Sequence, residues 1–232
     1  MPQFWLKNMT ENIFHKEQLQ KKIGVKFKNT DILEVALTHK SYAIENGIKE
    51  YNERLEFIGD SVLSSATAVF LYSKYPNYNE GKLSKIKSAA VSKNTLYSVA
   101  KKLSLGNYIK ISKSEELTGG REKESILANT VESVIGAIFL DSGYDVAAKF
   151  INNILTKQKI NTSDYKSELQ EIIQSKFKMT PTYKVLTETG PDHEKTFEIA
   201  VLTGKKHLGT GSGKSKKEAE QDAAKNALKK LK

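Results

Sequence analysis

Residues Asn52–Leu63 read NERLEFIGDSVL, and this stretch decides the fold of the larger part of the chain. Apolar residues recur in it at spacings of three and four, which predicts a helix that continues to Tyr75. On such a helix, the carboxylates of Glu53, Glu56 and Asp60 fall within roughly 60° of one another. This spacing most often marks a solvated acidic face. Because the remaining positions are largely apolar, we instead expect these carboxylates to lie in or beside packed surface.

A second apolar segment, Ser125–Asp141, repeats the arrangement. Asn129 and Glu132 are three residues apart and share one side of the predicted helix, and Gly136 continues that stripe. Oxygen ligands from two antiparallel helices suit Mg²⁺ or Mn²⁺, and such an ion activates water and stabilises charge on a phosphoryl group. The spacing therefore predicts a two-helix carboxylate site that can hydrolyse phosphodiesters. A lysine, an arginine or a metal ion should offset the repulsion between the acids.

The whole chain divides into two parts with different patterns. Helical spacing recurs throughout residues 10–156 and strand-like alternation is nearly absent there, which predicts an all-α domain. The segment 157–163, KQKINTS, is polar and lacks apolar periodicity, so we interpret it as a linker. The other helical segments of the first part are Glu17–Ile23, Asp31–Leu37, Lys82–Leu103 and Asp145–Leu155.

Residues 164–232 predict an α+β domain with the element order α-β-β-β-α. The first helix covers Asp164–Lys178, with Asp164 as its N-cap. Ser215 caps the last helix, and Glu218, three residues later, completes a capping box with it. Between the helices, apolar alternation predicts three antiparallel strands, which begin at Tyr183, span Thr196–Leu202 and span Lys206–Thr210.

The composition excludes several classes of protein. The net charge is +10 and the pI is near 9.4, which favours polyanion partners but decides little alone. Cysteine is absent, which excludes disulfides and cysteine-ligated zinc. Charge or glycine breaks every apolar stretch well before the length of about 18 residues that a membrane span needs, so we expect no membrane partner. The short apolar run near the N-terminus does not make a secretory segment, and we expect a cytoplasmic protein.

At these residues the chain resembles the ribonuclease III family. The segment Asn52–Leu63 matches the family signature nearly letter for letter, and the tail resembles the double-stranded RNA-binding domain that accompanies it. The resemblance covers almost the whole chain. It implies a Mg²⁺-dependent endoribonuclease, with Mn²⁺ as an alternative metal, that cuts double-stranded RNA to leave short 3′ overhangs and processes ribosomal and other structured transcripts. Further matches lie in Leu37–Tyr42, in Glu80–Ser84 and in Ser125–Glu132, with Gly136 beyond.

The resemblance also implies roles by position. Asp60 and Glu132 would be catalytic, and Glu53 and Glu80 would be accessory acids. Members of the family form homodimers through the helix that bears the signature. A subunit contact there would explain why position 59 is a glycine. A glycine inside a helix costs about 1 kcal/mol of stability relative to alanine. From the residues alone, Gly59 has two equally good interpretations: a neutral substitution, or a position where another backbone approaches closely. The implied metal ligands are Glu56, Asp60, Asn129 and Glu132.

Asn129 departs from the family pattern, which commonly has aspartate at this position. Its carbonyl oxygen can still ligate Mg²⁺, directly or through water, but the cluster has one negative charge fewer. We favour a variant that still cleaves, because Asp60 and Glu132 are intact. The alternative is a catalytically weak regulator that binds double-stranded RNA. A third possibility, a basic protein that compacts nucleic acids, predicts equal binding to duplex DNA and RNA.

The tail offers a surface for RNA. Lys214, Lys216 and Lys217 surround the start of the last helix, where backbone N–H groups and the helix dipole favour anions. A lysine-rich helix start is by itself usually just solvated, but the α-β-β-β-α order favours an RNA-binding role, in which an A-form duplex is recognised mainly by shape. The further contacts that the resemblance implies are Ser167, Gln170, Gln174 and, in a loop, His193.

Overall fold

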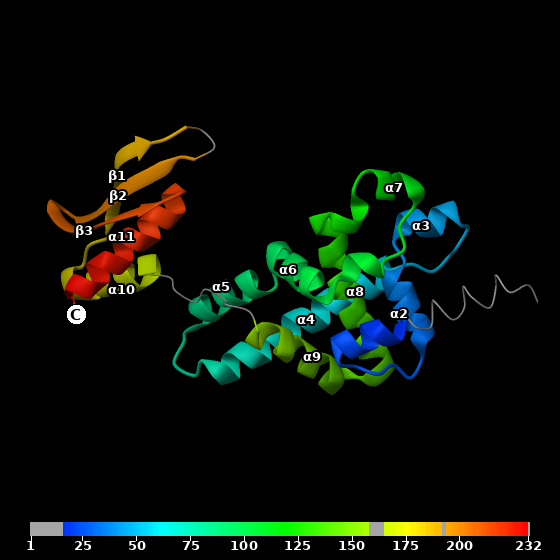
Figure 1. Ribbon diagram of the computed structural model, residues 1–232. Coiled ribbons are helices and arrows are strands. Elements are labelled where there is room, and N and C mark those ends of the chain that lie inside the picture. The colour runs from blue at the N-terminus through cyan, green and yellow to red at the C-terminus, as the bar shows by residue number, and fades with distance from the viewer. Residues whose placement is uncertain (1–15, 158–164, 192–193, 232) are drawn as a thin grey trace, which may run out of the picture. The chain divides into compact units, whose positions relative to one another are not determined.

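The computed structural model describes residues 16–157, 165–191 and 194–231. The chain forms two compact units that divide between Asn161 and Thr162 (Figure 1). Each unit buries its own apolar residues. Residues 10–15 of the predicted first domain, residues 158–163 of the predicted linker and the predicted N-cap Asp164 lie outside the described residues.

The first unit is all-α, as its periodicity predicts. Residues 16–23 form the first described helix. The one pairing of extended backbone in the described part of this unit is an isolated parallel bridge between Thr38 and Lys110. The helices that follow are α2 (Thr30–Leu37), α3 (Lys40–Glu45), α4 (Glu53–Lys74), α5 (Glu80–Ala90), α6 (Lys93–Leu103), α7 (Lys113–Leu117), α8 (Glu124–Ser142) and α9 (Tyr144–Thr156), with short 3-10 helices η1 (Leu105–Asn107) and η2 (Gly120–Glu122).

Helix α8 forms the centre of the first unit. Its apolar side chains, among them Ile126, Val131 and Ile138, are buried because α2, α4, α6 and α9 pack around it. Helix α4 makes the most extensive contact with it, and Figure 1 shows the two helices together in the middle of the unit. This packing joins the two segments in which the sequence predicts the carboxylates.

Two features of the first unit differ from the prediction. The segment Lys82–Leu103, predicted as one helix, is the two helices α5 and α6. Ser92 caps the start of α6, where its hydroxyl accepts a hydrogen bond from the Thr95 N–H over 3.4 Å. Helices α3 and α7 escape prediction because they are too short to show a period. Their starts are marked instead by capping side chains, His39 and Ser112.

Within the described residues, α4 and α8 are long and apolar enough to cross a membrane, judged by length and composition alone. We expected charged residues and glycines to interrupt every apolar stretch before it reached this length. That expectation is too strict, because α4 and α8 each contain 18 consecutive residues with high mean hydropathy and at most two charged side chains. A buried core helix passes the same test, and 61% of the α8 window is buried within the unit. The finding is thus only a weak indication of a membrane span.

The second unit is α+β, as predicted. Its three-stranded antiparallel sheet has the order β1-β2-β3. Phe197, Ile199 and Val201 alternate along β2 and are buried in the cores that the helices cover. The elements are α10 (Tyr165–Phe177), β1 (Thr182–Thr189), β2 (Thr196–Thr203), β3 (Lys206–Gly213) and α11 (Lys216–Leu231).

The packing of α11 on β3 explains two further differences. Strand β3 continues past its predicted end at Thr210 because its glycines admit the helix: a Cβ on Gly211 would overlap the backbone of α11 at Ala223. Glycine has low strand propensity, so apolar alternation does not reveal this extension. The capping box is also shifted. Ser215 accepts from the Glu218 N–H at 3.2 Å, but the Glu218 carboxylate accepts from the backbone N–H of the residue before Ser215, at 2.8 Å.

Candidate functional site

The site is built where α4 crosses α8. Gly59 and Gly136 face each other there: a Cβ on Gly59 would overlap the Glu132 carbonyl group, and a Cβ on Gly136 would overlap the Leu55 carbonyl group. The two backbones approach this closely only because both positions are glycine. The interpretation of Gly59 as a close approach is therefore confirmed. Its partner is α8 of the same chain, so the explanation from a subunit contact is wrong.

The crossing sets the acids of α4 beside the polar stripe of α8. Glu56 and Asp60 lie on either side of Gly59 along α4, and Asn129 and Glu132 come from α8. The Asn129 Nδ2 donates a hydrogen bond to Glu56 Oε1 over 2.9 Å. The structure thus brings the four implied ligands to one place on the surface of the first unit.

The beginning of α4 is fixed by two residues that the prediction missed. Asn52 is buried and its N–H donates to the Thr38 carbonyl oxygen at 3.0 Å. The Ser133 hydroxyl donates both to the Asn129 carbonyl oxygen at 2.9 Å and to the Asn52 carbonyl oxygen at 3.3 Å. A serine inside an apolar helix stripe was the available sequence signal, because a buried hydroxyl needs a partner. Ser133 therefore ties the start of α4 to the polar stripe of α8.

Burial and neighbouring charge keep a proton on this cluster. Burial first, and then the Asp60 and Glu56 carboxylates, raise the pKa of Glu132 from 4.5 to about 7, against the opposing charge of Lys93. Burial also raises the pKa of Glu56, while the hydrogen bond from Asn129 lowers it. The cluster thus carries more negative charge than its neighbours offset, and a bound cation would relieve this imbalance.

The donor set fits a hard divalent cation in kind. Carboxylate and amide oxygens are the ligands that Mg²⁺ takes, and the carboxylates are close enough to shift one another's pKa values. They are not closed around a common centre, because among the described residues no three acidic, histidine or cysteine side chains form a group that could hold a metal ion. Asn129 directs its N–H rather than its oxygen at Glu56. The Asn129 side-chain carbonyl oxygen is not used in this hydrogen bond.

The two implied accessory acids have partners of their own. Glu53 forms an ion pair with Lys40 at 3.2 Å and is 49% exposed, although its charge still raises the pKa of Glu56. Glu80 is exposed in the first turn of α5, where it accepts a hydrogen bond from the Ser84 hydroxyl at 2.7 Å. Glu53 thus lies close enough to act on Glu56, as a shared helical face predicts, while its carboxylate also pairs with Lys40.

In the second unit, the implied RNA-binding residues fall on two surfaces. Gln170 and Gln174 are exposed one turn apart on α10. Ser167, on the same helix, is half-buried and already engaged with a neighbour. His193 lies outside the described residues.

The three implied lysines gather at the start of α11. Lys214, Lys216 and Lys217 are exposed there. The ammonium group of Lys216 lies 5.7 Å from the centre of the Phe197 ring, which positions it by a cation–π contact. The start of α11 therefore presents several ammonium groups beside a helix N-terminus, which is an anion-binding arrangement.

The comparisons with known proteins agree across the chain. The family described as Ribonuclease-III-like matches residues 29–159, and the Double-stranded RNA binding motif matches residues 165–231. The chain is 45% identical over 221 residues to Ribonuclease 3 of Treponema denticola, covering 92% of this chain and 90% of that one. It is 48% identical over 218 residues to Ribonuclease 3 of Clostridium tetani, covering 91% and 93%. The nuclease domain of ribonuclease III from Campylobacter jejuni, studied for structural flexibility in a region involved in dimer formation, matches with a TM-score of 0.59 at 38% identity, over 62% of this chain and 97% of that one.

Proposed function

Because the chain belongs to the ribonuclease III family and is an endoribonuclease of double-stranded RNA, we propose that the α4–α8 cluster binds Mg²⁺ and is where the phosphodiester is hydrolysed. The observation that supports this proposal is the meeting of Glu56, Asp60 and Glu132 with Asn129 at the glycine crossing. Mn²⁺ accepts the same oxygen ligands. The family is metal-dependent, and the choice of Mg²⁺ rests on the oxygen-only donor set.

Each residue of the cluster has a role in this proposal. Glu56, Asp60, Asn129 and Glu132 hold the ion, which when bound lowers the pKa of water and offsets charge on the phosphoryl group. Burial and the neighbouring acids raise the pKa of Glu132 to about 7 in the metal-free protein, so binding of the ion would displace its proton. The charge of Asp60 contributes to the raised pKa of Glu132. Asn129 orients Glu56 through the 2.9 Å hydrogen bond.

The second unit is a double-stranded RNA-binding domain, and we propose that it holds the duplex by two surfaces. Lys214, Lys216 and Lys217 would contact phosphates. Gln170 and Gln174 have donors and acceptors suited to 2′-hydroxyls in the minor groove. Ser167 and His193 remain implied by position.

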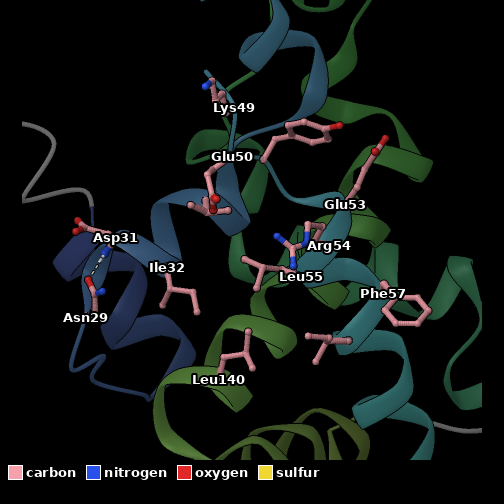
Figure 2. A pocket seen from close by; sticks show the side chains of 13 residues that line it. Asn29, Asp31, Ile32, Lys49, Glu50, Glu53, Arg54, Leu55, Phe57 and Leu140 are labelled. Carbon is pink, nitrogen blue, oxygen red and sulfur yellow. Dashed lines mark hydrogen bonds between the residues drawn. The ribbon is translucent and has the colours of Figure 1, made fainter. Parts of the chain in front are cut away.

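We further propose that the chain acts as a homodimer through the face of α4 that bears Phe57. Phe57 is 76% exposed although it belongs to a largely apolar helix. It borders a cavity of about 860 Å³, and Figure 2 shows its ring at the edge, with Leu140 on the other side. In a two-fold symmetric pair, each Phe57 ring can fill the cavity of the other subunit. Each subunit would then cut one strand and leave short 3′ overhangs.

Charges around the same cavity support a second copy as its occupant. Arg54 lines the cavity (Figure 2) and has no hydrogen-bond or ion-pair partner among the described residues. Asp31 and Glu50 line it as well, and neither forms an ion pair within the described residues. In the symmetric pair the guanidinium group can meet one of these carboxylates across the interface.

We also propose that this enzyme works in the cytoplasm on ribosomal and other structured transcripts. The absence of cysteine is consistent with a reducing compartment. The RNA-binding domain supports structured transcripts as substrates, because such domains recognise extended RNA duplexes. Metabolic labelling of RNA in cells depleted of the protein tests this: precursor ribosomal RNA should accumulate, and unchanged precursor levels contradict the proposal.

The alternative is a regulator that binds double-stranded RNA and cuts it poorly because of Asn129. A labelled RNA duplex incubated with the protein, in Mg²⁺ or in chelator, separates the two. Cutting in Mg²⁺ that chelator abolishes supports the enzyme. Binding without cutting, with cleavage gained in Asn129→Asp, supports the regulator. Equal binding to duplex DNA would instead support a general compacting protein.

A further inference from the structure

A buried hydroxyl group joins the two helices that bear the α4–α8 cluster. Ser133 follows Glu132 on α8, and its side chain is fully buried. The one proton of the hydroxyl is shared between two backbone carbonyl oxygens, that of Asn129 at 2.9 Å and that of Asn52 at 3.3 Å. Asn129 lies one turn earlier on α8, whereas Asn52 is the N-cap of α4. The hydroxyl therefore binds one carbonyl group from each helix.

The two carbonyl groups lead to the same pair of side chains. The Asn52 carbonyl oxygen also accepts from the Glu56 N–H at 2.9 Å, in the first turn of α4. The Asn129 side chain donates to the Glu56 carboxylate, also at 2.9 Å. From Ser133, one path thus reaches Glu56 through the backbone of α4 and the other through Asn129. These contacts close a ring across the crossing, which restrains Glu56 and Asn129 relative to each other.

The ring lies where the helices approach most closely. Asn52 and Leu55 are three residues apart on α4, and their carbonyl groups face Ser133 and Gly136, which are three apart on α8. Gly136 only leaves room for the approach, whereas Ser133 supplies an attractive contact. The other side of Asn52 is held as well, because its N–H donates to the Thr38 carbonyl oxygen at 3.0 Å. The carbonyl group that Ser133 binds is therefore fixed in place.

The second acceptor distinguishes Ser133 from an ordinary helical hydroxyl. A serine or threonine inside a helix often bonds only the carbonyl group one turn earlier. Thr130 is an example on the same helix: it is 2% exposed and donates to the Ile126 carbonyl oxygen at 2.7 Å. Within the described part of the chain, the Thr130 hydroxyl has no acceptor on α4. The bond from Ser133 to Asn52 thus has a role that packing within α8 does not require.

We propose that Ser133 is a positioning residue for the reaction, whose hydroxyl holds Glu56 and Asn129 at a fixed spacing and so sets the affinity of the cluster for its cation. This inference rests on the proposed function of the α4–α8 cluster. Mg²⁺ demands near-ideal octahedral geometry, so a small shift of one helix against the other weakens its binding. Removing a group that orients metal ligands typically costs about 10- to 100-fold in affinity or activity.

Metal binding by the protein without RNA tests the inference directly. Mn²⁺ is titrated into the protein, and the free ion is measured by electron paramagnetic resonance. Ser133→Ala should raise the Mn²⁺ dissociation constant about tenfold. The matched control is Thr130→Val, which removes an equally buried hydroxyl from the same helix and keeps the shape of the side chain. The control should bind Mn²⁺ like the unchanged protein, and equal Mn²⁺ affinities for the two variants overturn the inference.

The metal dependence of cleavage separates positioning from a loss of stability. Ser133→Ala should cut duplex RNA slowly at limiting Mg²⁺ and approach the rate of the unchanged protein at saturating Mg²⁺, because every implied ligand is still present. Urea unfolding should show a similar loss of stability in Ser133→Ala and Thr130→Val, since each loses one buried hydrogen-bonding hydroxyl. A rate deficit in Ser133→Ala that stays the same at all Mg²⁺ concentrations overturns the inference.

The failure of the inference can be told from the failure of the proposed site. If Glu132→Gln weakens Mn²⁺ binding and abolishes cleavage while Ser133→Ala binds Mn²⁺ normally, the site stands and only the inference falls. If Glu132→Gln binds Mn²⁺ and cleaves like the unchanged protein, the proposed site is contradicted and the inference falls with it.

Discussion

Gly59 and Gly136 meet backbone to backbone, and each leaves the space of its Cβ to a carbonyl group of the other helix. The carbonyl group that Gly59 accommodates belongs to Glu132, a member of the cluster itself. The glycine pair therefore sets the distance between the acids of α4 and those of α8. Any side chain placed between the helices would separate Glu56 from Asn129, which now share a 2.9 Å hydrogen bond.

Alanine at either glycine should damage both the fold and the site. We expect Gly59→Ala and Gly136→Ala each to lower the free energy of unfolding by about 2 kcal/mol or more, because overpacking a crossing forces the backbones apart. The control is Gly81→Ala on α5, where the nearest atom to the added Cβ is 3.8 Å away. This change should leave stability equal or raise it by about 0.5 kcal/mol. Urea unfolding monitored by circular dichroism gives the three values, and equal stability for all three variants contradicts the account.

The pKa of Glu132 makes the stability of the metal-free protein depend on pH. Between pH 4.5 and about 7, folded Glu132 keeps a proton that the unfolded chain has released. Stability therefore falls as pH rises through this window, and the loss persists above it. Thermal unfolding in chelator should show this fall, and Glu132→Gln should reduce it. The burial of His39 lowers the pKa of that group and acts with the opposite sign, so the difference between the two proteins is the quantity to measure. Added Mg²⁺ should restore stability above pH 7 in the unchanged protein only.

The lysines at the start of α11 should govern the salt dependence of RNA binding. We expect the double change Lys216→Ala and Lys217→Ala to weaken binding to all duplex sequences and to lower the slope of log affinity against log salt by about 1 per lysine. The control removes Lys229 and Lys230, which occupy the last turn of the same helix. Fluorescence anisotropy at several salt concentrations measures both. An unchanged slope in the first variant would contradict the proposal that these lysines contact RNA phosphates.

The exposed ring of Phe57 should decide the association state. Phe57→Asp should weaken dimerisation by about 3 kcal/mol or more, roughly 100-fold in the dissociation constant, because the interface would bury an unpaired carboxylate. Tyr72→Asp, at a ring that is 75% exposed further along α4, should leave the dimer intact. Sedimentation velocity over a concentration series distinguishes the two. A monomeric unchanged protein, or a dimer that survives Phe57→Asp, rules out this interface.

The sequence could predict the helices α4 and α8 because both are long segments with apolar residues at spacings of three and four. It could also predict that the acids of α4 and the polar stripe of α8 form one site, since carboxylates occur at matching spacing within two long apolar segments. The double-stranded RNA-binding unit was predictable for similar reasons, from the alternation in β2 and the cap at Ser215.

What the sequence could not predict depends on contacts between distant segments. The ion pair between Glu53 and Lys40 joins α4 to α3, and no local pattern encodes it. The direction of the Asn129 amide likewise depends on Glu56 across the crossing.

The central claim is that the α4–α8 cluster performs the cleavage, and Glu132→Gln measures this most directly. The change keeps the size of the side chain and removes its charge, and Glu124→Gln makes the same change at an exposed position of the same helix. In Mg²⁺, we predict that Glu132→Gln lowers the single-turnover rate on duplex RNA about a hundredfold or more while duplex binding is retained, and that Glu124→Gln has no effect. Cleavage by Glu132→Gln at the rate of the unchanged protein would contradict the account.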